Sequence, residues 1–354
     1  MDSDETVLVM DRMVRAWACQ QRGLCCQGHR ISVDRVQYDR MLGVLQAAGD
    51  PRAAAFHPEQ PPDEDGWRGL PTHDDARDAC IFLTDDQRCG FRLDHGPARL
   101  PHVCQKYPYI SLYTPSRLRV GLSFTCPTAL GLLADQAELD VLREPDGEPP
   151  VPFVTHLAAA DRVFTDVDGG PLTPDAFWAR HDALADAFAA AGPSWRAGFA
   201  AMVAAAGEAP VAPIAMTETS WLHGAFDGHL YAQLGDVQHM PAGLPGLWSQ
   251  SVYRPMPDPP PFDGDEDALL TRYLAHRLLV PAFYVTRTDL GWLLGALAIA
   301  IARYRVERAR GAAPVFALRH AELLLIHSPL PTRILGEPDQ RAAWRVLAAI
   351  ALAD

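Results

Sequence analysis

Residues 19–26 read Cys19-Gln20-Gln21-Arg22-Gly23-Leu24-Cys25-Cys26 and hold three thiols in eight positions, two of them adjacent. The other four cysteines all lie within the next hundred residues, at Cys80, Cys89, Cys104 and Cys126. The 228 residues that follow contain no cysteine. Seven cysteines placed at random in 354 residues would rarely all fall in the first third, so this part of the chain has a chemical need for sulfur.

Thiolates are soft ligands that suit zinc, Cu(I) and iron–sulfur clusters. A structural zinc ion and an iron–sulfur cluster each take four ligands, so the thiols suffice for either. A disulfide framework is disfavoured because the cysteine count is odd and the chain is long, whereas inert buried cysteines would pack as small apolar residues. We predict that the thiols converge on a metal or cluster, with the ligands Cys19, Cys25, Cys26, Cys80, Cys89, Cys104 and Cys126.

Other polar residues are weaker candidates. His29 and His102 lie within a few residues of cysteines, and mixed Cys/His sites are common for zinc, although polar surface histidines are the simpler interpretation. Glu322 and His327 on a late predicted helix are a candidate acid–base pair. Their spacing of five residues does not bring side chains face to face, which favours a solvated helix face instead.

Composition limits the classes of function. The formal charge of −13 argues against a nucleic-acid partner or a polybasic membrane-surface protein. The acidic N-terminus lacks the basic and apolar regions of a signal peptide. The longest apolar run, Leu290–Ala302, is thirteen residues, whereas a membrane span needs about 20, so we predict a buried helix there. Reduced thiols without an export signal predict a cytoplasmic protein.

The periodicity predicts an α+β fold: a small cysteine-rich, metal- or cluster-binding half with short strands (1–143), and a mainly α-helical half (155–354). A linker over 144–152 would separate two folding units. In the first half we expect a helix or extended segment over 7–17, a strand over 29–33, and a helix over 34–46 that Asp34 caps and Gly49-Asp50-Pro51 ends. Further along we expect a loop over 51–75, a hairpin-like turn between Cys80 and Cys89, a strand over 120–124, and a helix from Pro127 to Leu142. Cys126 would then occupy the N-cap, with a lowered thiol pKa. In the second half we expect helices over 173–191, 194–206, 266–284, 288–310, 316–327 and 340–352.

The cysteine pattern resembles the YkgJ-type cysteine-cluster family, a group of zinc- or iron-chelating proteins whose pattern is C-x-x-C-x-x-C-C, then C-x-F-L…C, then C…(Y/F)-P. The corresponding residues are Cys19, Cys25 and Cys26 in the first block, Cys80-Ile81-Phe82-Leu83 with Cys89 in the second, and Cys104 with Tyr107-Pro108 in the third. Arg22 stands where the family has the second cysteine of the first block, so one ligand of the usual set is missing. We expect Arg22 to point toward the thiols, where its positive charge would offset thiolate charge.

Within that group the chain is most similar to flagellin lysine-N-methylase and its relatives, which carry L…C-x-x-Y-P-R and then S-L-x-x-S-C-P-E-A. The matching stretches are Leu100…Cys104-Gln105-Lys106-Tyr107-Pro108-Tyr109 and Gly121-Leu122-Ser123-Phe124-Thr125-Cys126-Pro127-Thr128-Ala129. Tyr109 replaces the family's arginine and Thr128 its glutamate, which weakens any transfer of catalytic detail.

The resemblance implies an iron–sulfur cluster of the 4Fe–4S type, with zinc or iron as alternatives. It also implies an enzyme that transfers a methyl group from S-adenosylmethionine to a lysine of a protein or peptide. Two other classes stay open: a module that transfers electrons or metal without methyl chemistry, and a structural zinc site. For a methylase we expect a cleft between the halves. Tyr107 and Tyr109 would line it or, alternatively, only pack over the cluster.

Overall fold

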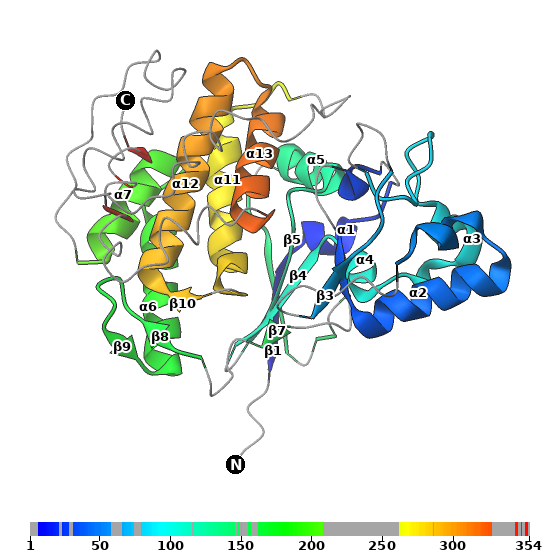
Figure 1. Ribbon diagram of the computed structural model, residues 1–354. Coiled ribbons are helices and arrows are strands. Elements are labelled where there is room, and N and C mark those ends of the chain that lie inside the picture. Colours follow the sequence, from blue (N-terminus) through cyan, green and yellow to red (C-terminus); the bar gives the residue numbers. More distant parts are fainter. Residues whose placement is uncertain are drawn as a thin grey trace, which may run out of the picture.

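The fold is described from a computed structural model of the chain (Figure 1). The described residues are 6–20, 23–27, 31–57, 66–73, 79–114, 117–136, 138–145, 147–148, 150, 155–156, 162–207, 262–285, 287–327, 344–345, 348 and 351–352. Within them the protein is a mixed α+β fold, with most of its strands in the first half and long helices in the second. This agrees with the predicted fold class at the level of secondary structure.

A five-stranded sheet forms the centre of the first half, in the order β6-β1-β5-β4-β7. Strand β1 runs parallel to β5 and antiparallel to β6, and β4 runs antiparallel to β5 and parallel to β7. Its strands are β1 (Val7–Asp11), β4 (Tyr109–Tyr113), β5 (Arg117–Leu122), β6 (Val141–Pro145) and β7 (Thr155–His156). Two smaller sheets pair β2 (Ser32–Asp34) with β3 (Trp67–Gly69), and β8 (Phe164–Thr165) with both β9 (Pro171–Leu172) and β10 (Thr288–Asp289).

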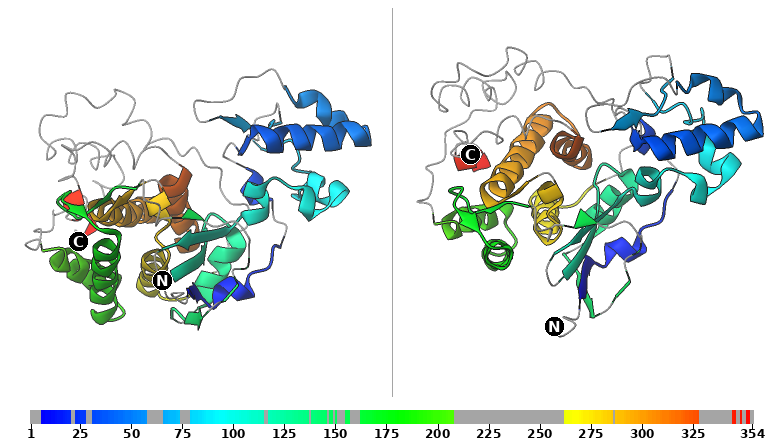
Figure 2. Two further views of the ribbon diagram at one scale, coloured as in Figure 1. Left: turned by 90° about the horizontal axis from the view of Figure 1, so that it is seen from below. Right: turned by 60° about the horizontal axis from the view of Figure 1, so that its bottom comes forward.

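Helices divide between the two ends of the molecule. Beside the sheet and beyond it lie α1 (Met13–Ala16), α2 (Arg35–Ala48), α3 (Gly90–His95), α4 (His102–Lys106) and α5 (Pro127–Asp135). The second half contributes α6 (Pro174–Ala190), α7 (Trp195–Ala205), α11 (Glu266–Leu279), α12 (Leu290–Ala309) and α13 (Pro314–His327). In all three views α2 and α3 lie at the edge of the molecule farthest from α6 and α7, with the sheet between them (Figures 1 and 2).

The described residues form two hydrophobic cores. The main core joins the sheet, α5 and the helices of the second half, so it continues across the predicted linker. The small core lies among α2, β2, α3 and the turns between them, and its buried residues come from the described positions between Cys26 and Leu100. The predicted domain division at 144–155 stays a prediction. The apolar packing separates the segment that carries α2 and α3 from everything else.

Several local predictions are confirmed. Asp34 caps α2 by accepting a hydrogen bond from the Gln37 backbone N–H, and Gly49 ends the helix in the left-handed conformation. The expected helices over 173–191, 194–206 and 316–327 correspond to α6, α7 and α13. The apolar run Leu290–Ala302 forms the buried first part of α12. None of the helices in the described ranges has the length and apolar character that a membrane span requires.

Other predicted boundaries of helices, strands and loops were wrong. The helix that begins at Pro127 ends at Asp135, because residues 141–145 form β6 and complete their backbone hydrogen bonds against β1. Part of the expected 144–152 linker is therefore an edge strand. The segment over 7–17 divides into β1 and α1, and the loop over 51–75 contains β3. Most of the expected helix over 340–352 lies outside the described residues. Arg22 also lies outside them, so its predicted position is not described.

Candidate metal centre

A close backbone approach places the first cysteine block. Gly23 has φ +66° and lies so near the Gln87 carbonyl that an added Cβ would sit 2.3 Å from its oxygen. Only glycine fits this position, because a side chain would be strained by the φ value and would collide with backbone. The contact holds the turn that leads to Cys25 and Cys26 against the turn that leads to Cys89. Glycine in this motif is thus a packing requirement of the site.

Backbone hydrogen bonds join the same two segments. The Cys80 N–H donates to the Cys26 carbonyl at 2.8 Å, and Gln27 bridges to Ala79 in antiparallel fashion. Within the second block, Leu83 and Cys89 form another antiparallel bridge. The hairpin-like turn predicted for residues 80–89 is therefore present. It carries Cys80 and Cys89 on the two arms of one short turn.

Five of the seven thiols belong to the small core. Cys26 and Cys80 are buried in it, and Cys25, Cys89 and Cys104 pack against it from partly buried positions. Cys104 reaches the core from α4. The three blocks of the sequence pattern thus supply thiols to one small region.

Only some of the cysteine sulfur atoms lie close to one another. The Sγ atoms of Cys25 and Cys26 lie 3.8 Å apart. Among the residues that the structure describes, no three cysteine sulfurs lie within 4.8 Å of one another. The group that does meet this distance is Asp50, Asp94 and His95, whose carboxylates are paired with Arg52 in an ion-pair network.

Burial and mutual interaction set the acidity of these thiols. A hydrogen bond from Cys26 lowers the pKa of Cys25, and the charges of Arg319 and Arg92 lower it further. The pKa of Cys26 is correspondingly raised well above its usual value. Burial is the largest cause of the raised pKa of Cys104 and of the rise to about 12 for Cys80. Neighbouring thiols, Cys25 and Cys89 among them, raise both further. Cys25 is therefore the first of the group to lose its proton.

Cys126 lies apart, in the main core at the N-cap of α5. The predicted lowering of its pKa was wrong. The N–H groups of Ala129 and Thr128 and the Trp17 side chain do lower the pKa, but burial outweighs them and raises it. Cys19 is exposed. Neither of these two thiols packs in the small core.

Arg319 was missed by the sequence reasoning. It donates from Nε to the Thr125 carbonyl at 3.1 Å, on the residue before Cys126, and its charge acts on Cys25 and Tyr107. The expected cation near the thiols was Arg22, which lies outside the described part of the chain. Arg319 comes from α13, nearly 200 residues later, so no local pattern points to it.

The two tyrosines lie beside the thiols in different ways. Tyr107 shares a hydrogen bond with Thr125 at 3.0 Å, and burial raises its pKa well above the usual value, with Cys126 and Cys25 adding to the rise. Tyr109 packs edge-on against Trp17, with ring centroids 5.1 Å apart. Trp17 in turn interacts with the Cys126 thiol. This places both rings between α4 and the N-terminus of α5.

A buried ion pair adjoins this region. Arg277 lies 3.0 Å from Glu322, and neither side chain is exposed. Glu322 also accepts hydrogen bonds from the Tyr273 hydroxyl at 2.8 Å and from the Phe124 backbone N–H at 3.2 Å. The predicted solvated face for Glu322 was therefore wrong, because α13 turns this residue into the core. The carboxylate is fully engaged, which makes it a structural anchor rather than a free base.

Of the two histidines predicted near the thiols, the structure describes His102. His102 is exposed at the start of α4, and its backbone N–H bonds to the Gln37 side chain. His29 lies outside the described residues, as does the side chain of His327.

The fold and this region together define an α+β protein that gathers thiols at the edge of a helical body. Comparison with family models, with curated proteins and with solved structures gives no match.

Proposed function

We propose that the chain holds a metal ion or iron–sulfur centre through thiolates of the small core. The observation that carries this proposal is the convergence of Cys25, Cys26, Cys80, Cys89 and Cys104 from three separate chain segments onto one side of the molecule. Arg92 and Arg319 supply positive charge that offsets thiolate charge. Buried thiols with raised pKa values lose their protons when a metal replaces them.

Two centres suit different parts of this geometry. Two thiolates on one tetrahedral ion, each about 2.3 Å from the metal, lie about 3.8 Å apart. The Cys25–Cys26 separation equals this value, which favours a zinc site as the second candidate. The wider spread of the other sulfurs favours a cluster, in which each iron takes one thiolate. A single shared ion requires Cys80, Cys89 or Cys104 to move toward the pair.

Metal analysis with a visible spectrum, after anaerobic purification, tests this proposal. Iron with sulfide and a brown colour supports a cluster, and stoichiometric zinc in a colourless protein supports the second candidate. Cys26→Ser should lose the metal, whereas Cys19→Ser, which removes an exposed thiol outside the small core, should keep it. Purified protein that contains neither metal, and binds neither on reconstitution, contradicts the proposal.

The finer part of the proposal is methyl transfer to a protein or peptide lysine, and it is supported by the resemblance of residues 17–132 to flagellin lysine-N-methylases. S-adenosylmethionine would supply the methyl group. The acceptor amine has an ordinary pKa near 10.4 and must lose its proton before attack. Tyr107, whose hydroxyl bonds to Thr125 next to Cys126, and Tyr109, which packs on Trp17, are the aromatic residues that would hold a lysine ammonium. Glu322 is not available as the base, because Arg277 and Tyr273 occupy it.

Incubation of the metal-loaded protein with labelled S-adenosylmethionine and cell lysate, without oxygen, tests methyl transfer. Label should appear on lysine, and Cys104→Ser should abolish it. Cys19→Ser is the matched control and should keep the activity. Metal-loaded protein without measurable affinity for S-adenosylmethionine by calorimetry excludes methyl transfer and leaves electron or metal transfer as the function of the centre.

A further inference from the structure

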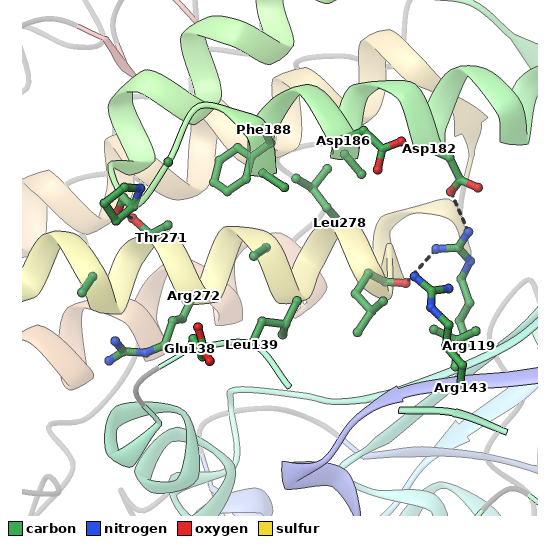
Figure 3. Close-up of a pocket in the computed structure, with 18 of the residues that line it drawn as sticks. Arg119, Glu138, Leu139, Arg143, Asp182, Asp186, Phe188, Thr271, Arg272 and Leu278 are labelled. Carbon is green, nitrogen blue, oxygen red and sulfur yellow. Dashed lines mark hydrogen bonds and ion pairs between the residues drawn. The ribbon is translucent and has the colours of Figure 1, made fainter. Parts of the chain in front are cut away.

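A cavity lies between the sheet and the helical half, away from the thiols. Its volume is about 820 Å³, within the range of small-molecule sites. Strands β1 and β5 and residues 138–143 form one wall, and α6 and α11 form the other (Figure 3). Tyr107 and Tyr109 are not among its lining residues. The cavity lies between the two halves, as the predicted cleft does, but it lacks the two tyrosines that were predicted to line that cleft.

Arg119 is a buried cation held rigidly at one end of this cavity. Only 4% of its surface is exposed. It donates to the Asp182 carboxylate at 2.8 Å and to the Leu279 carbonyl at 3.1 Å, and its guanidinium lies 5.2 Å from the Trp178 ring centroid. Its Nε–H has no hydrogen-bond partner in the described structure. A buried donor without a partner is costly, which points to a ligand atom that completes it.

Positive charge is in surplus at this end. Arg117 and Arg119 share the one carboxylate of Asp182, at 2.7 and 2.8 Å. The guanidinium of Arg143 lies at the same end (Figure 3) and makes no hydrogen bond or ion pair with the described residues. Asp186 lies one helical turn from Asp182 on α6 and is the other acid nearby. Three guanidinium groups thus face two carboxylates, and Asp182 is already engaged.

The rest of the cavity is mainly apolar. Leu139, Phe188 and Leu278 line its middle, and Arg272 and Glu138 stand at the far end (Figure 3). Arg272 itself is anchored, because its guanidinium donates to the carbonyls of Leu133 and Ala134. A ligand that fits this wall has an apolar body and an anionic group near Arg119 and Arg143.

We infer that this cavity binds a small molecule with a carboxylate or phosphate group and an apolar body. Bidentate hydrogen bonds from guanidinium groups are the usual recognition of both anions. The cavity adjoins Arg117 and Arg119 on β5, whereas Cys126 follows the other end of that strand. No cysteine is among the residues that line the cavity, so the anion binds apart from the thiols. The inference is therefore independent of the proposed metal centre.

Calorimetry on the full chain with four probes of equal chain length tests this inference: octanoate, octyl phosphate, octanol and octyltrimethylammonium. One or both anions should bind, and whichever binds more tightly identifies the preferred group. Arg143→Gln should weaken anion binding at least about tenfold, because a charge-assisted hydrogen bond is lost. Arg40→Gln removes one positive charge beside the small core, outside the cavity, and should leave the affinity unchanged.

Arg119→Gln tests the buried donor, with circular dichroism to verify folding. Because Arg143 is exposed, its variant gives a result even when the Arg119 variant does not fold. Absence of binding by both anions overturns the inference. So does equal binding of the cation or of octanol, or an unchanged affinity in Arg143→Gln.

Discussion

The small core and the main core are held together by different means. The main core joins a five-stranded sheet to long helices, and α12 is buried over most of its length. The small core has one long helix, α2, and otherwise short turns and bridges. Its interior is a row of neighbouring aromatic rings, Tyr38, Phe56, Phe82 and Phe91, beside the thiols.

This difference implies that the two cores are stabilised by different interactions. A small core buries too little apolar surface to be stable by itself and usually needs a metal or another cross-link. The main core has ample apolar surface, and its polar groups, such as Arg277 and Glu322, are buried in pairs. We therefore expect ligation to stabilise the small core and packing to stabilise the main core, which the following predictions test in order of expected effect.

Metal removal should have the largest effect, and on the small core alone. Binding of a structural zinc is worth about 10 kcal/mol or more in small zinc domains, because folding and ligation are coupled. After chelation, amide hydrogen exchange should become fast in α2 and α3 while α11 and α12 stay protected. Limited proteolysis should cut within residues 31–104 first. Equal loss of protection in both cores would mean that they form one cooperative unit.

Glu322→Leu should have the next largest effect, and on the main core. Removal of one partner leaves the Arg277 charge buried without compensation, at about 3–5 kcal/mol of unfolding free energy. Urea denaturation measures the loss. Glu144→Gln breaks the surface pair with Arg15 and should cost at most about 1 kcal/mol. The double variant Arg277→Met/Glu322→Leu should recover most of the stability; failure to do so would mean that packing, not charge, dominates.

Local signals made much of this fold predictable. Asp34, Gly49 and Pro127 mark helix ends by mechanisms that act within a few residues, and each does so in the structure. Strand β6 was missed because its pairing partner, β1, lies more than 130 residues earlier. Edge pairing of this kind leaves only a weak alternation in the sequence, which a proline-rich composition obscured.

The candidate site was predictable in its thiols but not in its surroundings. Cysteine spacing indicated which residues belong together, because ligation demands particular atoms. Arg319 and the burial of Glu322 depend on how α13 packs against residues 122–125, which helical periodicity alone does not determine. The raised pKa of Cys126 shows the same limit, since its N-cap position was predicted and its burial was not.

On acidification, the main core should lose stability at a higher pH than the small core does. Burial, reinforced by the charge of Arg119, lowers the pKa of His181 from 6.5 to about 3, although Asp182 opposes this. Between these values the unfolded state binds the proton and the folded state does not, so stability rises with pH and is lost on acidification. From pH 6.5 to 4.5 the loss should be about 2 kcal/mol.

The comparison residue in the small core is Asp50, whose pKa the Arg52 side chain lowers from 3.8 to about 2. Its contribution is present above pH 4 and is lost only below it, as pH falls toward 2. Urea denaturation of His181→Gln against the parent chain at pH 6.5 and 4.5 measures the first effect. The variant should lose less stability than the parent over this interval; parallel losses would assign the acid sensitivity to other groups.

Removal of one helix cap in each core should have the smallest effect on stability. It also tests most directly whether the two cores unfold separately. Asp34 accepts a hydrogen bond from the Gln37 N–H at 2.8 Å, and Thr173 accepts one from the Ala176 N–H at 3.2 Å. Loss of either cap costs about 1 kcal/mol locally. In α6 this cost should appear in the global unfolding free energy, because the helix unfolds with the main core. In α2 it should appear as faster amide exchange of that helix alone, because a weakly packed unit opens locally.

Asp39→Ala, which removes an exposed partner of Arg35 on α2, controls for charge and should change the free energy of local opening by less than about 0.5 kcal/mol. If Asp34→Ala lowers the global unfolding free energy as much as Thr173→Ala does, the two cores unfold together and their separation in packing has no energetic counterpart.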